Sequence, residues 1–319
     1  MQTPLITGAA GFVGNALVAA LQTRAFRRAL RRPAANVQSG DIIVGDIGPD
    51  TDWRQALQGV DCVVHLAART HVLREDAADP LTAYHRINVE ATRNLAQQAA
   101  ATGVRRFVFL SSVKVNGETT PGRPYTEADV PTPQDTYGIT KLEAEDVLRE
   151  IAARSAMELV ILRPPLVYGP GVKGNFLRLL KIIERGIPLP LASVCNRRSL
   201  VHVANLADAI VTCVDKPAAA GNTFLVSDGE DVSTPDLIRK LAAAMGKSRP
   251  QLLPCPVALL EWGAALLGQR DAMARLTGSL TVDASHIRST LGWHPRIPLD
   301  QGLIETARWY HQAQIQRRT

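Results

Sequence analysis

The first half of the chain alternates short apolar runs with longer segments in which apolar residues recur at helical spacing. Strands are predicted at 4–7, 26–32, 41–46, 61–67, 106–112 and 158–164, and most of these segments are apolar runs, although 26–32 contains four arginines. The segments between them predict helices at 12–22, 80–102 and 136–155. Because the strands are apolar almost throughout, rather than at every second position, we expect a parallel sheet covered by helices on both faces.

The pattern changes after Pro164. Glycine and proline are dense in 164–174, and 185–199 has no regular period. Two short strand candidates, 199–203 and 223–228, stand among helices. The sequence therefore predicts an α/β fold in two parts. These are a doubly wound parallel sheet at 1–164 and mainly a smaller α/β substrate-binding lobe at 165–319, from which about 199–226 returns to the sheet.

The composition is that of an ordinary globular protein, with 46% hydrophobic and 21% charged residues among 319. The formal net charge is +6, but the positive residues are scattered, and the densest cluster, 24–33, alternates with apolar residues. We therefore expect an anionic small molecule as the partner rather than nucleic acid. The four cysteines stand far apart, with no Cys/His cluster that would indicate a metal site. Such cysteines are typical of reduced thiols in a cytoplasmic protein.

The hydropathy of the chain predicts neither a signal peptide nor a membrane-spanning segment. Residues 4–14 already have a strand-and-turn pattern, so no signal peptide is expected. The most apolar stretch, 256–268, is too short to span a bilayer and contains Glu261. It predicts a helix that faces the core rather than a membrane anchor.

A glycine-rich turn follows the first predicted strand and opens the first predicted helix. In TGAAGFVG (7–14), Gly8, Gly11 and Gly14 have the spacing GxxGxxG. Glycine permits the tight turn and the close approach of a pyrophosphate, and the helix N-terminus offers N–H groups and a positive dipole end. At this place in an α/β chain, the turn predicts a dinucleotide site at the carboxyl ends of the strands.

The end of the second strand bears on which dinucleotide binds. Chains that bind NAD usually place a carboxylate there to bond the ribose hydroxyls. Here Arg31 and Arg32 stand at that place, and an arginine can pair with a 2′-phosphate. This pattern favours NADP(H) over NAD(H). Asp46, at the end of the third strand, is a candidate for bonding the adenine amine.

Tyr137 and Lys141 stand four residues apart at the start of a predicted helix, so both side chains point the same way. A phenol has a reference pKa near ~10, and a neighbouring ammonium favours its ionised form. That arrangement suits the phenol to acid–base catalysis. Ser112, at the end of the predicted strand 106–112, is expected at the same cleft. The three residues form a candidate catalytic set.

These features resemble the extended short-chain dehydrogenase/reductases that act as nucleotide-sugar epimerases, dehydratases and reductases. The resemblance extends over nearly the whole chain, through the motifs DCVVHLAA, INVEATRNL, LSSVKVNG, YGITK, LRPPLVYGPG, RRSLVHVANLADAI and LGWHPRIPLDQGLIETARWY. It implies a Rossmann domain, hydride transfer at a sugar carbon (usually C4) and a UDP-linked sugar as substrate. It also implies a homodimer in which the helices at 80–102 and 136–155 form a four-helix interface.

The resemblance implies a role for each residue that matches a family motif. Tyr137 is the general acid/base, Lys141 holds the nicotinamide ribose and lowers the pKa of Tyr137, and Ser112 hydrogen-bonds the reacting sugar oxygen. Further cofactor contacts are implied at Gly8, Gly11, Phe12, Val13, Gly14, Ile47, Leu66, Ala67, Ala68, Asn88, Ser111 and Pro164. Contacts with the substrate are implied at Thr70, Ser112, Asn175, Arg198 and Arg275. A guanidinium suits a diphosphate because its fork bonds two oxygens.

Departures from the family patterns narrow the choice of reaction. Dehydratases follow the serine or threonine with Asp-Glu, whereas this chain has Val113 and Lys114 there, so dehydration is not expected. Epimerases that retain NAD have an acidic second-strand end, whereas Arg31 and Arg32 fit exchangeable NADPH. We therefore slightly favour a 4-keto-reductase of an N-acetylated or 6-deoxy UDP-hexose in bacterial surface-polysaccharide synthesis. The alternative is a 4-epimerase of UDP-glucose or UDP-N-acetylglucosamine with bound NAD, and a non-catalytic dinucleotide-binding regulator is less favoured.

Overall fold

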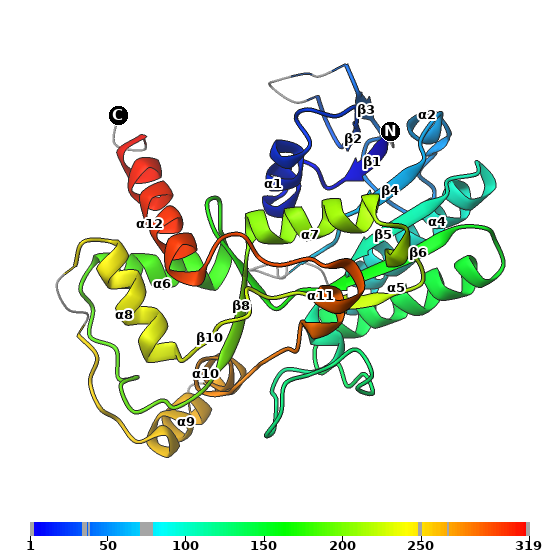
Figure 1. Ribbon diagram of the computed structural model, residues 1–319. Coiled ribbons are helices and arrows are strands. Elements are labelled where there is room, and N and C mark those ends of the chain that lie inside the picture. Colours follow the sequence, from blue (N-terminus) through cyan, green and yellow to red (C-terminus); the bar gives the residue numbers. More distant parts are fainter. Residues whose placement is uncertain are drawn as a thin grey trace.

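The central sheet is parallel throughout (Figure 1). The computed structural model describes residues 3–33, 37, 39–70, 79–247, 251–266 and 268–316. Within them the sheet runs from edge to edge through β3 (Asp41–Ile43), β2 (Arg27–Leu30), β1 (Pro4–Thr7), β4 (Cys62–His65), β5 (Arg106–Leu110), β6 (Glu158–Arg163) and β9 (Thr223–Leu225). The order of the strands reverses between β1 and β4, which is where doubly wound sheets bind their ligands. The predicted α/β fold with a doubly wound parallel sheet is confirmed.

Most strands are shorter than the apolar runs that predict them. β1 and β4 are buried at every position, as expected for a sheet covered on both faces. β2 ends at Leu30. Arg31 and Arg32, which were predicted to belong to the strand, follow its carboxyl end and are exposed. These two arginines therefore lie at the edge where a ligand would bind, on the surface rather than in the sheet.

Helices cover both faces of the sheet and lie on opposite sides of its strands in Figure 1. On one face, α1 (Phe12–Ala20) packs against α7 (Val203–Asp215), and α11 (Ser285–Leu291) adds side chains to the same apolar core. On the other face, α4 (Ala91–Ala101) packs against α5 (Thr136–Ala153), beside the short α2 (Arg54–Leu57).

The helix predicted at 80–102 forms as three joined segments. These are α3 (Pro80–His85), a π-helical turn η1 (Arg86–Glu90) and α4. Asp79 caps the start, because its Oδ1 accepts a hydrogen bond from the N–H of Thr82 at 3.2 Å and Pro80 occupies the first turn. Single π turns inside α-helices are frequent at functional sites, and this one carries Asn88.

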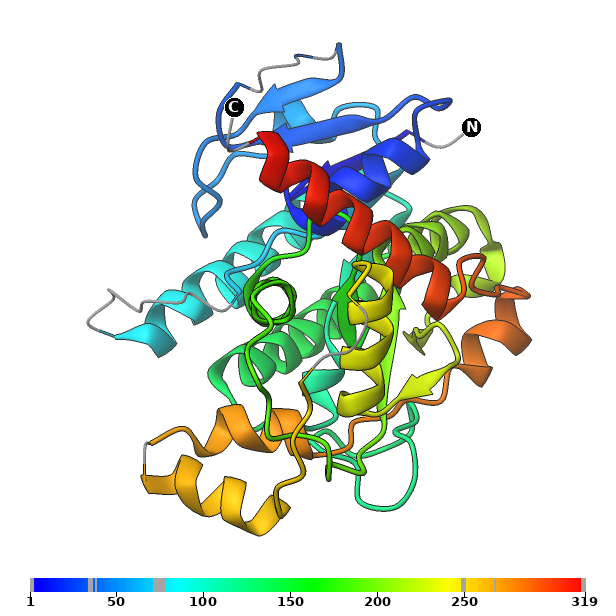
Figure 2. The ribbon, with the colours of Figure 1, turned by 90° about the vertical axis from the view of Figure 1, so that its left-hand side faces the viewer.

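The second part of the molecule is built on a small sheet of β10 (Asp231–Val232), β8 (Arg198–His202) and β7 (Leu166–Tyr168). Its core is enclosed by α6 (Gly174–Glu184), α8 (Thr234–Ala244) and α12 (Leu299–Gln316), and Figure 2 shows α8 and α12 side by side. Two 3-10 turns, η2 (Val113–Val115) and η3 (Pro217–Ala219), lie in loops. Within the segment 199–226, α7 and β9 lie with the central sheet, whereas β8 belongs to the small one.

Helices α9 (Val257–Leu266) and α10 (Arg270–Thr277) project from the edge of the molecule at the bottom of Figures 1 and 2. The prediction that 256–268 faces the core is wrong. Val257 and Leu260 are only partly buried against the core of the second part, and Ala264 is the buried residue of α9 among those that the structure describes. Because this stretch is apolar on every side, contact along one side leaves the other in water.

Candidate active site

The glycine turn between β1 and α1 packs directly against the chain that leaves β4. Gly8 has a φ of 68°, and a Cβ there would stand 2.8 Å from the N of Ala67 and 2.9 Å from the carbonyl carbon of Leu66. A Cβ on Gly14 would stand 2.2 Å from the carbonyl oxygen of Gly8. Gly11 is the N-cap of α1 and offers no side chain to its first turn. Those N–H groups therefore suit an anion such as a pyrophosphate, and the cradle fits a dinucleotide.

Phe12, also predicted to contact the cofactor, extends away from the turn and packs against the core enclosed by α6, α8 and α12. Its ring is partly buried there and stands 3.4 Å from where a Cβ on Gly171 would lie. Val13 packs on the core under α1, and Leu66 packs on the same core. Ala68 is half-buried in the loop after β4. The turn and this loop thus lie together at the carboxyl ends of β1 and β4.

Arg31 and Asp46, both predicted as cofactor contacts, form an ion pair with each other. Both side chains are mostly exposed. Arg32 is exposed beside them, and Ile47 is partly buried against the core under α2 and α4. Arg31, whose positive charge favoured a 2′-phosphate, therefore already has a carboxylate partner in Asp46.

Asn88 joins the loop after β4 to the helix that carries Tyr137. Its Oδ1 accepts from the N–H of Arg69 at 2.8 Å, and its Nδ2 donates to the carbonyl of Arg69 and to Oγ1 of Thr140, both at 3.1 Å. The side chain is 1% exposed. Asn88 thus fixes the distance between the two segments that flank the expected nicotinamide site. Thr70, predicted to contact the substrate, is exposed at the end of the same loop.

Tyr137 and Lys141 lie one turn apart near the start of α5, which begins after Asp135. Oδ1 of Asp135 accepts from the N–H of Gly138 at 2.8 Å and caps the helix. Tyr137 is half-buried, whereas Lys141 is 2% exposed and its Nζ lies 4.1 Å from the centre of the Phe109 ring. Burial lowers the pKa of Lys141 to about 7, although Glu145 opposes the shift.

The prediction that the pKa of Tyr137 is lowered is wrong for the chain by itself. Burial raises the pKa of Tyr137 above its ordinary value, and the negative charge of Asp135 and the nearby Tyr84 add to the rise. Lys141 does not lower the pKa of Tyr137 as its spacing suggested, because burial disfavours the positive charge of Lys141 itself. Its ammonium lies between the Phe109 ring and Glu145.

The two neighbouring serines have different surroundings. Ser112 is half-buried, and its Oγ accepts from the N–H of Lys114 at 3.2 Å at the start of η2. Ser111 is 3% exposed, and its Oγ donates to Oε1 of Glu145 at 2.5 Å, within the core. Pro164, a predicted cofactor contact, is buried, and its carbonyl accepts from the N–H of Val113 at 3.0 Å.

Four buried polar residues behind Lys141 and the exposed Arg149 form what we call the Glu145 cluster: Glu145, Ser111, Asn116, Arg163 and Arg149. Arg163 donates to both carboxylate oxygens of Glu145, from Nε at 2.9 Å and from Nη2 at 2.6 Å. Arg163 also donates to Oδ1 of Asn116 at 3.1 Å, and Arg149 donates to Glu145 at 2.8 Å. The sequence analysis missed this cluster, and the one available signal was that Glu145 stands four residues after Lys141.

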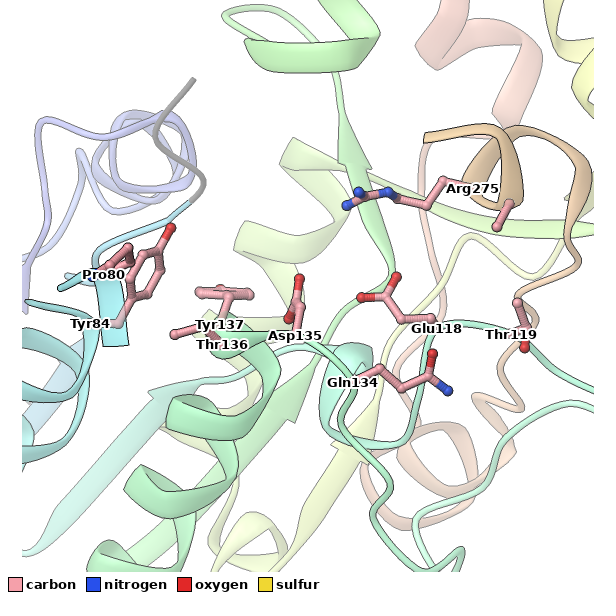
Figure 3. A pocket seen from close by; sticks show the side chains of 10 residues that line it. Pro80, Tyr84, Glu118, Thr119, Gln134, Asp135, Thr136, Tyr137 and Arg275 are labelled. Atoms are coloured by element: carbon pink, nitrogen blue, oxygen red, sulfur yellow. The ribbon is translucent and has the colours of Figure 1, made fainter. Parts of the chain in front are cut away.

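Tyr137 lines a hollow of about 460 Å³ that carries charge of both signs (Figure 3). Glu118 and Asp135 line it on one side, and both carboxylates pair with Nζ of Lys114, at 2.8 and 2.5 Å. Glu118 stands only four residues after Lys114, whereas Asp135 is brought to it across 21 residues. Arg275 extends into the hollow from α10 on the other side.

The structure brings Arg275 and Arg198 together. Nη1 of Arg198 donates to the carbonyl of Arg275 at 2.8 Å and to that of Gly278 at 3.1 Å. Burial lowers the pKa of Arg198, Glu118 opposes the shift, and the charge of Arg275 adds to it. The positive charge of Arg275 acts on the Arg198 guanidinium, and a diphosphate bound between them would offset that repulsion. Asn175 is exposed near the start of α6 and makes no contact that ties it to this pair.

Among the residues that the structure describes there is neither a candidate metal site nor a membrane-spanning helix. No group of three or more His, Cys, Asp or Glu side chains there is placed to hold a metal ion. None of the helices in the same part of the chain is long and apolar enough to cross a membrane.

Comparison with known proteins identifies the family. The model of the NAD dependent epimerase/dehydratase family matches residues 4–227. A UDP-glucose 4-epimerase from Vibrio cholerae is 47% identical over 314 residues, which cover 97% of this chain and 95% of that protein. An N-acetyl-alpha-D-glucosaminyl-diphospho-ditrans,octacis-undecaprenol 4-epimerase from Escherichia coli O157:H7 is 27% identical over 325 residues, covering 96% and 94%. The solved structure of MoeE5 in complex with UDP-glucuronic acid and NAD has a TM-score of 0.79 and 28% identity, covering 98% of this chain and 99% of that one.

A family model that spans residues 4–227 and a relative that is 47% identical along almost the whole chain agree with the resemblance seen in the sequence motifs. The glycine cradle at the carboxyl end of β1 and the Tyr137–Lys141 pair on α5 stand where the motifs placed them. The chain belongs to the NAD dependent epimerase/dehydratase family.

Proposed function

We propose that this chain is a 4-epimerase of a UDP-linked hexose, with NAD as its cofactor. The observation that carries the proposal is the 47% identity, along 97% of the chain, to the UDP-glucose 4-epimerase of Vibrio cholerae. It favours the 4-epimerase over the 4-keto-reductase that the sequence alone slightly favoured. The relative from Escherichia coli O157:H7 is also a 4-epimerase, of a sugar whose diphosphate is joined to undecaprenol.

In this proposal, NAD supplies a nicotinamide that takes a hydride from C4 of the sugar and returns it to the opposite face. Gly8, Gly11 and Gly14 hold the pyrophosphate. Lys141 holds the nicotinamide ribose, and Asn88 keeps the adjoining loop in place through Arg69. We propose NAD rather than NADP(H), because the family model is that of an NAD dependent family and the MoeE5 structure is a complex with NAD; the ion pair of Asp46 with Arg31 agrees with this choice.

The remaining roles belong to the sugar. Tyr137 would act in its ionised form: the phenolate takes the proton of the C4 hydroxyl as C4 is oxidised, and the phenol so formed returns it when C4 is reduced. Ser112 hydrogen-bonds the same oxygen. Arg198 and Arg275 hold the diphosphate. Arg275 lines the hollow beside Tyr137, and Arg198 of β8 is joined to it by a hydrogen bond to its backbone carbonyl. Thr70 and Asn175 lie at the surface and are proposed only as contacts that form once substrate is bound.

We also propose that the protein is a cytoplasmic homodimer that serves bacterial surface-polysaccharide synthesis. The dimer would form through the helices that contain α4 and α5, which pack side by side on one face of the sheet. Light scattering on a size-exclusion column would test the dimer, because a monomer at working concentration would contradict it.

A 4-keto-reductase remains the second candidate, because β2 is followed by Arg31 and Arg32 rather than by a carboxylate. One pair of assays separates the candidates. The purified protein is first examined by native mass spectrometry for bound NAD, and is then incubated with UDP-glucose and with UDP-N-acetylglucosamine without added cofactor. The proposal expects bound NAD and conversion to the C4 epimer, followed by proton NMR of the anomeric region. Stoichiometric consumption of NADPH with a UDP-4-keto-hexose, and no epimerisation, would favour the reductase.

Tyr137→Phe tests the catalytic assignment. Loss of general acid–base catalysis is expected to lower kcat about 10²–10⁴-fold, with little change in stability. Tyr84→Phe is the matched control, because Tyr84 lines the same hollow but its hydroxyl donates to the carbonyl of Thr70 at 2.9 Å. If the two variants lost activity equally, Tyr137 would not be the proton carrier.

A further inference from the structure

Helix α9 carries a stripe of large apolar side chains on its exposed side. Leu259, Trp262 and Leu266 are 55%, 64% and 69% exposed. Their spacing of i, i+3 and i+7 places them on one side of the helix. The opposite side is anchored, since Val257 and Leu260 pack partly on the core of the second part and Ala264 is buried. The helix is therefore held in place while it presents the stripe outward.

A single exposed leucine needs no explanation, but a row that includes a tryptophan marks a contact surface. We call Leu259, Trp262 and Leu266 the α9 stripe. Its position at the outer edge of the molecule, far from α4 and α5, separates it from the proposed dimer interface (Figures 1 and 2).

The α9 stripe adjoins the active site. Trp262 lines a second hollow of about 400 Å³ together with Glu261, Ala265, Arg270 and Ala274. Ala274 also lines the hollow that contains Tyr137, so the two hollows meet at this residue of α10. The next residue, Arg275, extends into the hollow of Tyr137. A molecule that runs outward from Tyr137 past Arg275 therefore reaches the groove between α9 and α10.

This order matches the parts of one class of substrate. The sugar lies at Tyr137, the diphosphate lies at Arg275 and Arg198, and the carrier of the diphosphate lies in the groove. A hydrocarbon chain in this groove would cover apolar surface of Trp262, and Leu266 stands exposed one turn beyond it on α9. Tryptophan and arginine together are also typical of a helix that lies at a membrane surface, and Arg270 stands beside Trp262 in the groove.

We propose that the groove between α9 and α10 binds the isoprenoid chain of a lipid carrier, so that the enzyme also acts on a hexose linked to a polyprenyl diphosphate. This inference rests on the proposed function, because it uses the same Tyr137 chemistry and the same diphosphate contacts. The hydride and proton transfers are unchanged, and only the group attached to the distal phosphate differs.

The test compares glucose carried on UDP, on geranyl diphosphate and on geranylgeranyl diphosphate, with the same purified enzyme. We expect all three to be epimerised and KM to fall about tenfold from the shorter to the longer isoprenoid chain, since the longer chain buries more apolar surface. Trp262→Ser combined with Leu266→Ser is expected to raise KM for the geranylgeranyl substrate about tenfold or more. The same variant should leave kcat and the KM for UDP-glucose within about twofold.

Ile315→Ser is the matched control, because Ile315 is 65% exposed on α12, away from the groove. It should leave every KM unchanged. Turnover of UDP-glucose with none of either isoprenoid substrate would overturn the lipid inference and leave the proposed function intact. Turnover of none of the three, with no epimerisation of UDP-N-acetylglucosamine by the same enzyme, would reject the proposed function, and the lipid inference with it.

Two other results would replace the isoprenoid as the occupant of the groove. An equal rise in KM for UDP-glucose and for the geranylgeranyl substrate in the stripe variant would place the uracil ring, rather than a lipid, against Trp262. A change of oligomeric state in that variant, measured by light scattering, would show that a second copy of the chain covers the α9 stripe.

Discussion

Arg163→Met removes the main partner of a buried carboxylate one helical turn beyond Lys141. Arg163 and Glu145 are 2% and 0% exposed, and two hydrogen bonds of 2.9 and 2.6 Å join them. Removing one partner of a buried ion pair costs roughly 3–5 kcal/mol, because the remaining charge stays buried without compensation. We expect Arg163→Met to lower the free energy of unfolding at neutral pH by about this amount, measured by urea denaturation followed by circular dichroism.

The loss should depend on pH. Burial opposes ionisation of Glu145, but the bonds from Arg163 outweigh it and lower the pKa of this carboxyl below its ordinary 4.5. A carboxyl whose pKa is lower in the folded state contributes stability above the unfolded pKa and loses it as the pH falls through the folded pKa. The difference between wild type and Arg163→Met should therefore be largest near neutral pH and shrink in acid.

Arg149→Met is the matched control, because Arg149 also donates to Glu145, at 2.8 Å, but its side chain is 42% exposed. Its loss should cost about 0–1 kcal/mol. The double variant Glu145→Leu, Arg163→Met should recover most of the stability, because an apolar pair of similar volume replaces a buried ion pair at little cost. Equal costs for Arg163→Met and Arg149→Met, or a double variant no better than Arg163→Met, would refute the reasoning.

Three further predictions concern the binding sites and Lys141. Arg198→Met should weaken UDP binding by roughly 10–150-fold, because a charge-assisted contact is lost, and should leave NAD binding unchanged in calorimetry. The same substitution at the neighbouring, exposed Arg197 is the control. Equal weakening of both ligands would contradict the assignment. Asp46→Asn should free Arg31 and shift the preference toward NADP by no more than about fivefold, since exposed ion pairs are weak; an unchanged ratio of NADP to NAD affinity would show that Arg31 does not reach the 2′ position. Lys141→Met should gain stability relative to wild type near pH 7, and the gain should shrink up to about pH 10, because the buried ammonium of wild type loses its proton more readily than the unfolded one. A gain that did not change with pH would show that Lys141 is not titrating in this range.

The central fold was predictable because its strands are apolar on both faces. β1 and β4 are buried at every position, and only their last residues, Thr7 and His65, are polar. The glycine turn was equally readable, since a Cβ at Gly14 would stand 2.2 Å from the carbonyl of Gly8. In both cases a local requirement excludes most residue types, so the sequence carries the signal.

Where partners come from distant segments, the sequence carried no comparable signal. Lys114 pairs with Asp135 across 21 residues, and Arg198 bonds the backbone of Arg275 across 77. The exposure of α9 was missed for a different reason. Apolar residues on all sides of a helix predict burial, but only the packing of the rest of the chain determines which side is covered.

Helix α5 shows where these two kinds of information meet. Tyr137, Lys141 and Glu145 stand four residues apart, so they follow one side of the helix from the hollow into the core. The first is half-buried, and the second and third are 2% and 0% exposed. The spacing alone explains why Tyr137 and Lys141 point the same way. The position of Lys141 also depends on the carboxylate of Glu145, which lies one turn deeper. Arg163 of β6 and Ser111 of the loop after β5 hold that carboxylate in place. The Tyr137–Lys141 pair is thus predictable from the spacing on one helix, whereas the residues that hold Glu145 behind it come from β6 and from the loop after β5.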